Sequence, residues 1–249
     1  MPLFVLLSFT IACVVLFRIV VGPIAVKALG NMPAKPVVTV IGEYDLPPGA
    51  ASYFDSIRPD LESLGFTFVD YVRVEGAARN VLPYLMFFRN GATMDMAFAS
   101  VMFILGKKPK VHSYLEFYRK FAGAFEVDTN NSRTPGVFKK DPKKDVFPFP
   151  DVASPRRLFE LHQKLAQRRT RSAPQMPPEG EEIDFFRANY PKSLKRQAEF
   201  GYLKLDHAIY RHTWKGACLM TWKLCWPIKS IRASLARRET ASLVRELGL

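Results

Sequence analysis

The sequence has few of the residues that build the best-known catalytic and metal sites. It contains three cysteines and four histidines in 249 residues. An odd, small number of cysteines argues against a disulfide framework and favours a reducing compartment. The sequence also has no glycine-rich phosphate loop, no G-x-S-x-G, no H-E-x-x-H and no paired C-x-x-C motif. We therefore expect no cofactor and no metal, and these absences leave open whether the chain is an enzyme.

Acidic side chains are absent from the first 35 residues, and charge is uneven along the rest of the chain. The formal net charge is +13. Residues 36–106 hold more acids than bases, whereas residues 107–171 and 187–249 are strongly basic. A basic surface attracts phosphates, whether they belong to anionic lipid or to nucleic acid. Because no helix-turn-helix motif is evident, nucleic-acid binding through the basic C-terminal region is kept only as an alternative.

The longest apolar run lies at the start of the chain. Residues 2–26 contain one charged side chain, that of Arg18. A helix of this length is enough to cross the roughly 30 Å of bilayer hydrocarbon. We therefore predict a transmembrane anchor over residues 1–28. A cleaved signal peptide, which would need basic residues before the apolar run, and a buried core helix are the alternatives.

The flanking charges predict the orientation of this anchor. Lys27 and Lys35 follow the apolar run, and no lysine or arginine precedes it. Loops rich in lysine and arginine stay on the cytoplasmic side of a membrane. We therefore expect a single-pass membrane protein whose C-terminal body lies in the cytoplasm.

The first part of the body, residues 36–170, has the pattern of an α+β domain. A strand at 36–44 precedes a helix at about 50–64, in which Pro59 should cause a kink or a break. The apolar period then changes to two, as in strands. The strands expected from this pattern are 66–74, 82–88, 94–104, 113–121 and 124–129. Short turns, such as the Asn-Gly pair at 90–91 and the turn expected at 106–109, favour an antiparallel meander sheet with a helix packed on one face, in two layers.

The rest of the chain is expected to be mainly helical. An irregular connection at 130–153 leads to a leucine-rich helix that begins near Ser154. A linker at 171–183, rich in proline and glutamate, separates this helix from a helical C-terminal segment at 184–249. That segment contains a small hairpin within 200–217. Thr213 can then cap a helix that begins at Trp214, and amphipathic, basic helices follow.

All three tryptophans lie between residues 213 and 226. On a helical wheel their rings lie between an apolar face and a face with lysines. Tryptophan is favoured at the bilayer interface, and a basic tail follows, so we predict a helix that lies on an anionic membrane surface. The residues expected at this surface are Trp214, Trp222, Trp226, Lys223, Lys229 and Arg232. An ordinary core helix and a helix that binds a partner protein are the alternatives.

Three polar residues are weak candidates for a catalytic site. His112 lies beside a turn, and Asp128 and Asn130 belong to a polar loop at 128–136. Side chains of this kind bind a ligand, or they simply cap and turn the backbone.

These patterns favour a membrane-anchored protein that acts by binding or as a scaffold. Its expected partners are the lipids of an anionic membrane and a protein partner. The alternatives are a membrane-bound enzyme with a pocket between sheet and helix, and a nucleic-acid-binding protein.

Overall fold

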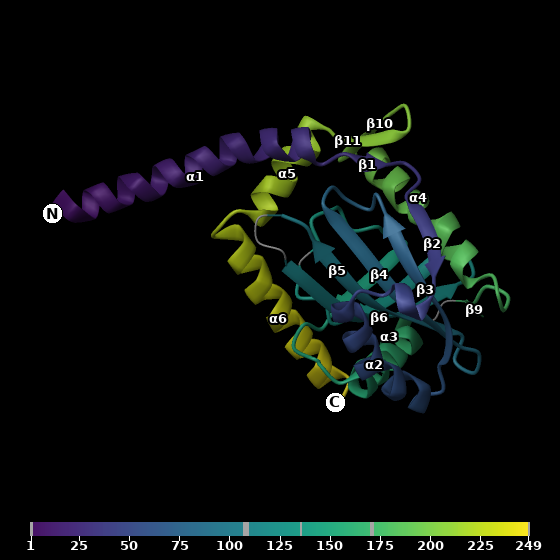
Figure 1. The fold of residues 1–249 in the computed structure, drawn as a ribbon. Helices are drawn as coiled ribbons and strands as arrows, with labels where there is room; N and C mark the ends of the chain where they lie inside the picture. The colour runs from purple at the N-terminus through teal and green to yellow at the C-terminus, as the bar shows by residue number, and fades with distance from the viewer. Residues whose placement is uncertain (1, 107–109, 135, 170–171, 249) are drawn as a thin grey trace.

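The computed structural model describes residues 2–106, 110–134, 136–169 and 172–248, without the side chains of residues 2–4 and 10–19. The side chains of Cys13 and Arg18 and part of the turn predicted at 106–109 therefore lie outside the described residues. Within the described ranges the fold is α+β, with one large, mostly antiparallel sheet and a second sheet of three strands (Figure 1).

The large sheet follows the chain in order, from β2 to β8, and β9 pairs with β6. Neighbouring strands are antiparallel, except that β7 and β8 are parallel. The strands are β2 (Val37–Ile41), β3 (Thr67–Glu75), β4 (Val81–Asn90), β5 (Asp95–Ile104), β6 (Lys110–Phe121), β7 (Phe125–Asn130), β8 (Lys144–Pro148) and β9 (Pro174–Gln175). The five strands predicted between residues 66 and 129 are confirmed. The prediction of an irregular connection at 130–153 is wrong for β8, which pairs with a strand close to it in the chain.

The hairpin between β4 and β5 forms where its turn signal predicts. The Oδ1 atom of Asn90 accepts hydrogen bonds from the backbone N–H groups of Ala92 at 3.1 Å and Thr93 at 3.2 Å. Its Nδ2 donates to the carbonyl oxygen of Leu64 at 3.1 Å, just after the end of the first body helix. One side chain therefore closes the turn and fastens a helix to the sheet.

Helices cover both faces of the large sheet. The helices α2 (Pro48–Ser63) and α3 (Pro155–Arg169) bury Phe54 and Leu161 against one face, together with Phe117 of β6. On the second face α4 (Glu182–Glu199) packs its apolar side against the sheet. The prediction of two layers is therefore wrong, because the apolar stripe of α4 buries the second face and makes a third layer. The helix α2 also continues through Pro59, where a break was possible.

The segment at 171–183, expected to be a linker, contacts the body at several of its described residues. The strand β9 pairs with the end of β6, and the hydroxyl of Ser172 donates to the carbonyl oxygen of Ala122 at 2.8 Å. Glu182, which is 1% exposed, forms an ion pair with Arg89 at 2.8 Å. These contacts fix the start of α4 over the sheet.

The second sheet joins a strand that follows α1 to a hairpin in the C-terminal segment. It contains β1 (Met32–Pro33), β10 (Leu203–Asp206) and β11 (Ile209–His212), in the order β1-β11-β10. The hairpin predicted within 200–217 is confirmed as β10 and β11. The remaining helices are α1 (Pro2–Leu29), α5 (Trp214–Leu224) and α6 (Ile228–Glu246), and a 3₁₀ turn, η1 (Glu43–Asp45), follows β2.

The helix α1 projects from the body, and its N-terminal end lies far from the sheet (Figure 1). Among the residues that the structure describes, no helix combines the length and the apolar character needed to cross a membrane.

Candidate functional site

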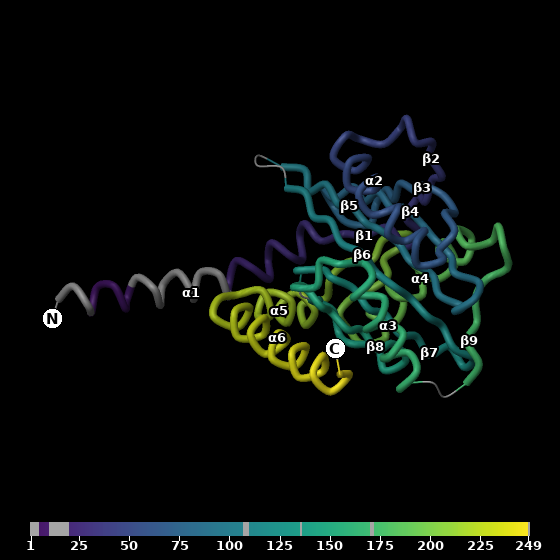
Figure 2. The backbone as a smooth tube through the Cα atoms, turned by 90° about the horizontal axis from the view of Figure 1, so that it is seen from below, coloured from purple at the N-terminus to yellow at the C-terminus, as the bar shows by residue number. Residues whose placement is uncertain are grey.

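The C-terminal end of α1, residues 20–29, is here called the root of α1, and it packs against α5. Figures 1 and 2 both show these two helices side by side. A Cβ atom on Gly22 would clash with the side chain of Thr221 on α5, so the helices can approach this closely only at a glycine. The Nζ of Lys27 lies 5.1 Å from the ring centroid of Trp214 and donates to the carbonyl oxygen of His212 at 3.4 Å. The root of α1 is thus part of the body.

The helix α5 begins at the predicted cap. The hydroxyl oxygen of Thr213 accepts a hydrogen bond from the N–H of Gly216 at 2.9 Å, and the hydroxyl donates to the carbonyl oxygen of Gly201 at 2.6 Å. A Cβ atom on Gly216 would overlap the backbone carbonyl of Tyr202, so α5 rests directly on the backbone there. The buried side of the helix carries Ala217 and Met220.

The three tryptophans remain largely exposed. The exposed fractions of Trp214, Trp222 and Trp226 are 57%, 52% and 60%. Further large apolar side chains exposed on the root of α1, on α5 and on α6 include Val20, Val21, Ile24, Leu224, Ile231 and Leu235. In both views the corner between α5 and α6 lies on the side of the body from which α1 projects. We call Trp214, Trp222, Trp226 and these six residues the tryptophan surface.

The basic residues predicted beside the tryptophans have different environments. The Nζ of Lys223 donates to the carbonyl oxygens of Val137 at 2.8 Å and Phe138 at 3.1 Å, so its ammonium group turns toward the body. Arg232 donates to the carbonyl oxygen of Gly136 at 3.0 Å. Lys229 is exposed. Two of the three cations therefore hold the 136–138 loop, and the third faces solvent.

The three weak catalytic candidates do not converge. Asp128 on β7 is 2% exposed and forms an ion pair with Lys144 of β8. Asn130 turns the backbone, because its Oδ1 accepts from the N–H of Ser132 at 3.1 Å. His112 lies near the start of β6, opposite Met102 of β5. Of the three, Asp128 lies closest to the residues that line the cavity described next.

A cavity of about 250 Å³ lies between α4 and the large sheet. Its apolar walls are Phe87, Met96 and Phe98 from β4 and β5, and Phe185, Phe186 and Tyr190 from α4. Glu116 and Tyr118 of β6 also line it, with Glu126 of β7 and Lys144 of β8. Side chains alternate along a strand, so Glu116 and Tyr118 point to the face of the sheet opposite to Phe117.

The ionisable side chains at the polar end of this cavity have shifted pKa values. Burial, together with the carboxylate of Asp128, raises the pKa of Glu116 well above its ordinary value. Burial also raises the pKa of Glu126. Burial opposes the charge of Lys144, but the carboxyl groups of Asp128 and Glu116 outweigh it and raise the pKa of Lys144. Glu116 therefore retains its proton to a higher pH than an exposed glutamate does.

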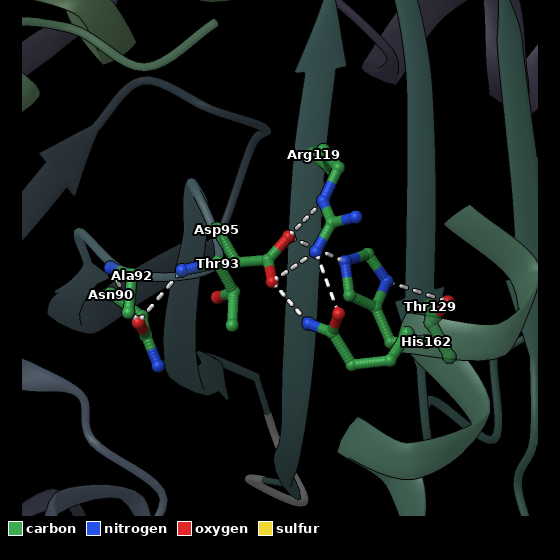
Figure 3. A network of polar contacts seen from close by, with 8 residues as sticks. Asn90, Ala92, Thr93, Asp95, Arg119, Thr129 and His162 are labelled. Atoms are coloured by element: carbon green, nitrogen blue, oxygen red, sulfur yellow. Dashed lines mark hydrogen bonds and ion pairs between the residues drawn. The ribbon is translucent and has the colours of Figure 1, made fainter. Parts of the chain in front are cut away.

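The opposite face of the sheet holds a second buried polar cluster (Figure 3). The Nε and Nη2 atoms of Arg119 donate to the two carboxylate oxygens of Asp95, at 2.6 and 2.7 Å. The ring of His162 lies between this carboxylate, 3.1 Å from Nε2, and the hydroxyl of Thr129, 3.0 Å from Nδ1. Gln163 donates to Asp95 and accepts from Arg119 at 2.9 Å. We call Asp95, Arg119, Thr129, His162 and Gln163 the Asp95 network.

Burial alone would raise the pKa of Asp95. The hydrogen bonds from His162 and Arg119 outweigh it and lower the pKa of Asp95 to about 2. Asp95 and His162 are both 0% exposed, so no ligand reaches them in this structure. This network stabilises the fold and is not a candidate binding site.

Sequence reasoning identified Asp128 but not Glu116 or Lys144. The alternation of Tyr114, Glu116 and Tyr118 with apolar residues was a signal that Glu116 shares a face with two tyrosines. Nothing local to the sequence indicated that α4 would cover that face. Within the described residues no group of histidine, cysteine, aspartate and glutamate side chains is arranged to hold a metal ion.

Comparison with models of known protein families, with curated proteins and with solved structures finds no match to this chain. The tryptophan surface and the cavity between α4 and the large sheet are therefore the features that bear on function.

Proposed function

We propose that this chain is a single-pass membrane protein that acts by binding. Residues 1–28 anchor it through an apolar run of which the side chains of 10–19 lie outside the described residues, the body lies in the cytoplasm, and the C-terminal segment rests on an anionic membrane surface. One observation carries the proposal: α5 lies beside the root of α1, where that helix leaves the body (Figures 1 and 2), and its first residue, Trp214, lies against Lys27 of that root. A bilayer around the projecting part of α1 would meet the half-exposed rings at its interface, which is where tryptophan is favoured.

The charges near this corner support the same arrangement. Lys229, Arg237 and Arg238 are exposed on α6, which follows the tryptophans, and Arg237 also lies 3.8 Å from the carboxylate of Asp151. Each basic side chain close to an anionic leaflet contributes about 1 kcal/mol to membrane binding, and salt weakens the sum. Lys27 and Lys35 follow the apolar run, which supports a cytoplasmic body.

The anchor is tested by placing charge in the apolar run of the full chain. Leu6 and Leu7 are exposed on the projecting part of α1. An arginine costs up to about 2.5–3.5 kcal/mol for insertion at the centre of a membrane helix and less toward its ends, so two are introduced together. We expect the double variant Leu6→Arg/Leu7→Arg to move from the membrane fraction to the supernatant of a carbonate-washed cell lysate.

The matched control makes the same chemical change elsewhere. Leu205 and Ile209 are exposed on the hairpin of β10 and β11, away from the projecting part of α1 (Figure 1). We expect Leu205→Arg/Ile209→Arg to stay with the membrane. If both variants and the unchanged chain fractionate alike, residues 1–28 are not the anchor.

Tryptophan fluorescence reports directly on the membrane-facing surface, because all three tryptophans belong to it. In vesicles with brominated phosphatidylglycerol, we expect the emission of the full chain to be quenched. In neutral vesicles, or with Lys229, Arg237 and Arg238 changed together to glutamine, quenching should weaken. Emission that is insensitive to brominated lipid in every vesicle would rule out contact between α5 and the bilayer.

A further inference from the structure

The helix α5 runs beside the root of α1 in the opposite direction. Lys27 of the root lies 5.1 Å from the ring centroid of Trp214, at the start of α5, whereas Gly22 lies against Thr221, about two turns further along α5. The C-terminal end of α5 therefore points toward the projecting part of α1. Figures 1 and 2 both place the corner between α5 and α6 on that side of the body.

The exposed side of α5 carries tryptophan and cysteine side chains in one row. Trp214, Cys218 and Trp222 follow one another at intervals of four residues, so they share one face of the helix. The side chain of Cys218 is exposed, as both tryptophans are. Cys225, at the C-cap of the helix, is partly exposed and continues this row three residues after Trp222. Both cysteines thus lie among the rings of the tryptophan surface.

Packing does not explain a cysteine in this position. Cysteine is among the residues most often buried, and its reactivity more than its packing gives it a role. The thiols of Cys218 and Cys225 are free, and about 10 Å of helix separates the two residues, too far for a disulfide between them. Within the part of the chain that the structure describes, neither belongs to a group that could hold a metal ion. Covalent addition at the sulfur is the chemistry open to them.

We propose that Cys218 and Cys225 are sites of S-acylation, and that each sulfur carries a long fatty acyl chain that enters the bilayer beside α1. This inference rests on the proposed function, because the acyl chains need a membrane at the tryptophan surface. Cysteines next to a membrane span or on an amphipathic membrane helix are the usual sites of this modification. Trp222, Leu224 and Trp226 are exposed around Cys225, so an acyl chain there would leave the protein over apolar side chains.

The acyl donor is the thioester of a long-chain fatty acid with coenzyme A. The cysteine sulfur, after loss of its proton, attacks the carbonyl carbon of the donor. A bond forms between this carbon and the cysteine sulfur, the bond from the carbon to the sulfur of coenzyme A breaks, and coenzyme A takes up a proton and leaves as a thiol. One thioester replaces another, so the reaction consumes no oxidant and no reductant. A nucleophile such as hydroxylamine cleaves the product and restores the cysteine.

Acylation would make the contact between α5 and the bilayer reversible. One acyl chain alone gives only marginal attachment to a membrane, and a second signal makes the attachment stable. Here the second signal is close by, because α1 and the exposed cations of α6 act at the same corner of the body. Removal of the acyl groups would free this corner from the leaflet while α1 still holds the chain.

The test counts thioesters on the full chain, expressed in a eukaryotic cell line whose membranes contain protein acyltransferases. Free thiols are blocked with N-ethylmaleimide, thioesters are cleaved with neutral hydroxylamine, and each thiol that is released receives a polymer tag that shifts the band on a gel. We expect two hydroxylamine-dependent tags on the unchanged chain. Cys218→Ser and Cys225→Ser should each carry one, and the variant with both changes should carry none.

Trypsin assigns the two sites without any variant. Cleavage after Lys215, Lys223 and Lys229 places Cys218 and Cys225 on separate peptides. Mass spectrometry should show a fatty acyl group on both peptides, and hydroxylamine should remove it from both. If only one peptide is modified, the assignment of the other cysteine is overturned.

A cysteine placed away from the tryptophan surface is the matched control. Ser63 is exposed at the end of α2, and α2 lies away from the projecting part of α1 in Figures 1 and 2. In the background without Cys218 and Cys225, Ser63→Cys should gain no tag. A tag at this position would mean that any exposed thiol of the chain is acylated, and it would overturn the proposal.

The proposal is also overturned if the unchanged chain carries no hydroxylamine-dependent tag, or if every tag persists when Cys218 and Cys225 are both changed to serine. Membrane fractionation of the same samples separates this result from the proposed function. An unmodified chain that stays in the membrane fraction overturns acylation alone. If the acyl groups are present, but Leu6→Arg/Leu7→Arg fractionates like the unchanged chain after hydroxylamine has removed them, the anchor alone is overturned.

Discussion

The two faces of the large sheet bury polar groups in opposite ways. On the α3 face Asp95 is fully buried, and Arg119, His162 and Gln163 all donate to it or contact it. On the α4 face Glu116, Glu126 and Asp128 share Lys144 beside a cavity. The first cluster is fully buried, whereas the second borders a cavity. Polar groups that are fully paired stabilise a fold, whereas buried carboxyl groups that crowd around one ammonium group have raised pKa values.

The largest expected effect comes from breaking the paired cluster on the α3 face. Arg119→Met leaves Asp95 as a buried charge without its main partner. We expect the free energy of unfolding to fall by about 3–5 kcal/mol, measured by urea denaturation of the full chain. Arg79→Met, which changes an exposed arginine, should cost no more than about 0.5 kcal/mol. A loss in Arg119→Met as small as in this control would mean that the pair does not stabilise the fold.

A smaller effect should appear in acid. The pKa of Asp95 is about 2 in the folded protein, against an ordinary value of 3.8. A lowered carboxyl pKa means that the unfolded chain binds more protons, so this stabilisation is present above about pH 4 and is lost as the pH falls to about 2. The amount is about 2 kcal/mol. Urea unfolding between pH 4 and pH 2 should show a steeper loss for the unchanged chain than for Asp95→Asn; parallel curves would contradict the prediction.

The smallest effect, of about 1 kcal/mol, is expected on the α4 face, and its sign is reversed. The pKa of Glu116 is raised, so the folded protein binds more protons than the unfolded chain does. Stability due to this group must therefore fall as the pH rises above the ordinary glutamate range. Glu116→Gln should remove that fall and be slightly more stable than the unchanged chain near pH 7. Glu160→Gln, at an exposed position on α3, is the control. The prediction is contradicted if Glu116→Gln is less stable than the unchanged chain and its free energy of unfolding varies with pH in the same way. That result would mean that the carboxyl group of Glu116 is ionised and paired in the folded protein.

Local chemistry made several parts of this fold predictable. The Asn90 turn and the Thr213 cap depend on side chains that bond backbone groups within three residues, so their signals are short and readable. The strands between residues 66 and 129 follow from a period of two over long apolar runs. Structural elements that depend on residues close together in the sequence could therefore be predicted from it.

Other features depend on which segments meet in space. Lys144 lies in a stretch rich in lysine and proline, and only its parallel pairing with β7 makes that stretch a strand and brings the lysine to Asp128. Lys223 was assigned to a polar helix face, yet the carbonyl groups of a distant loop bind it. The cavity exists because α4 covers the second face of the sheet. Helical periodicity predicted α4 as a helix but did not indicate which face it would cover.

The pairing of β1 with β11 has a consequence for the order of synthesis. Met32 lies opposite Tyr210, and Gly22 lies against Thr221, so a segment that is synthesised early binds segments that are synthesised much later. The nascent chain can complete the large sheet while its N-terminal helix still lacks its neighbours. Contacts between such distant segments form late, because a long loop must close first. Attachment of the body to α1 therefore depends on residues after 200, and we expect a chain truncated before residue 200 to hold that helix to the large sheet only through residues 30–36.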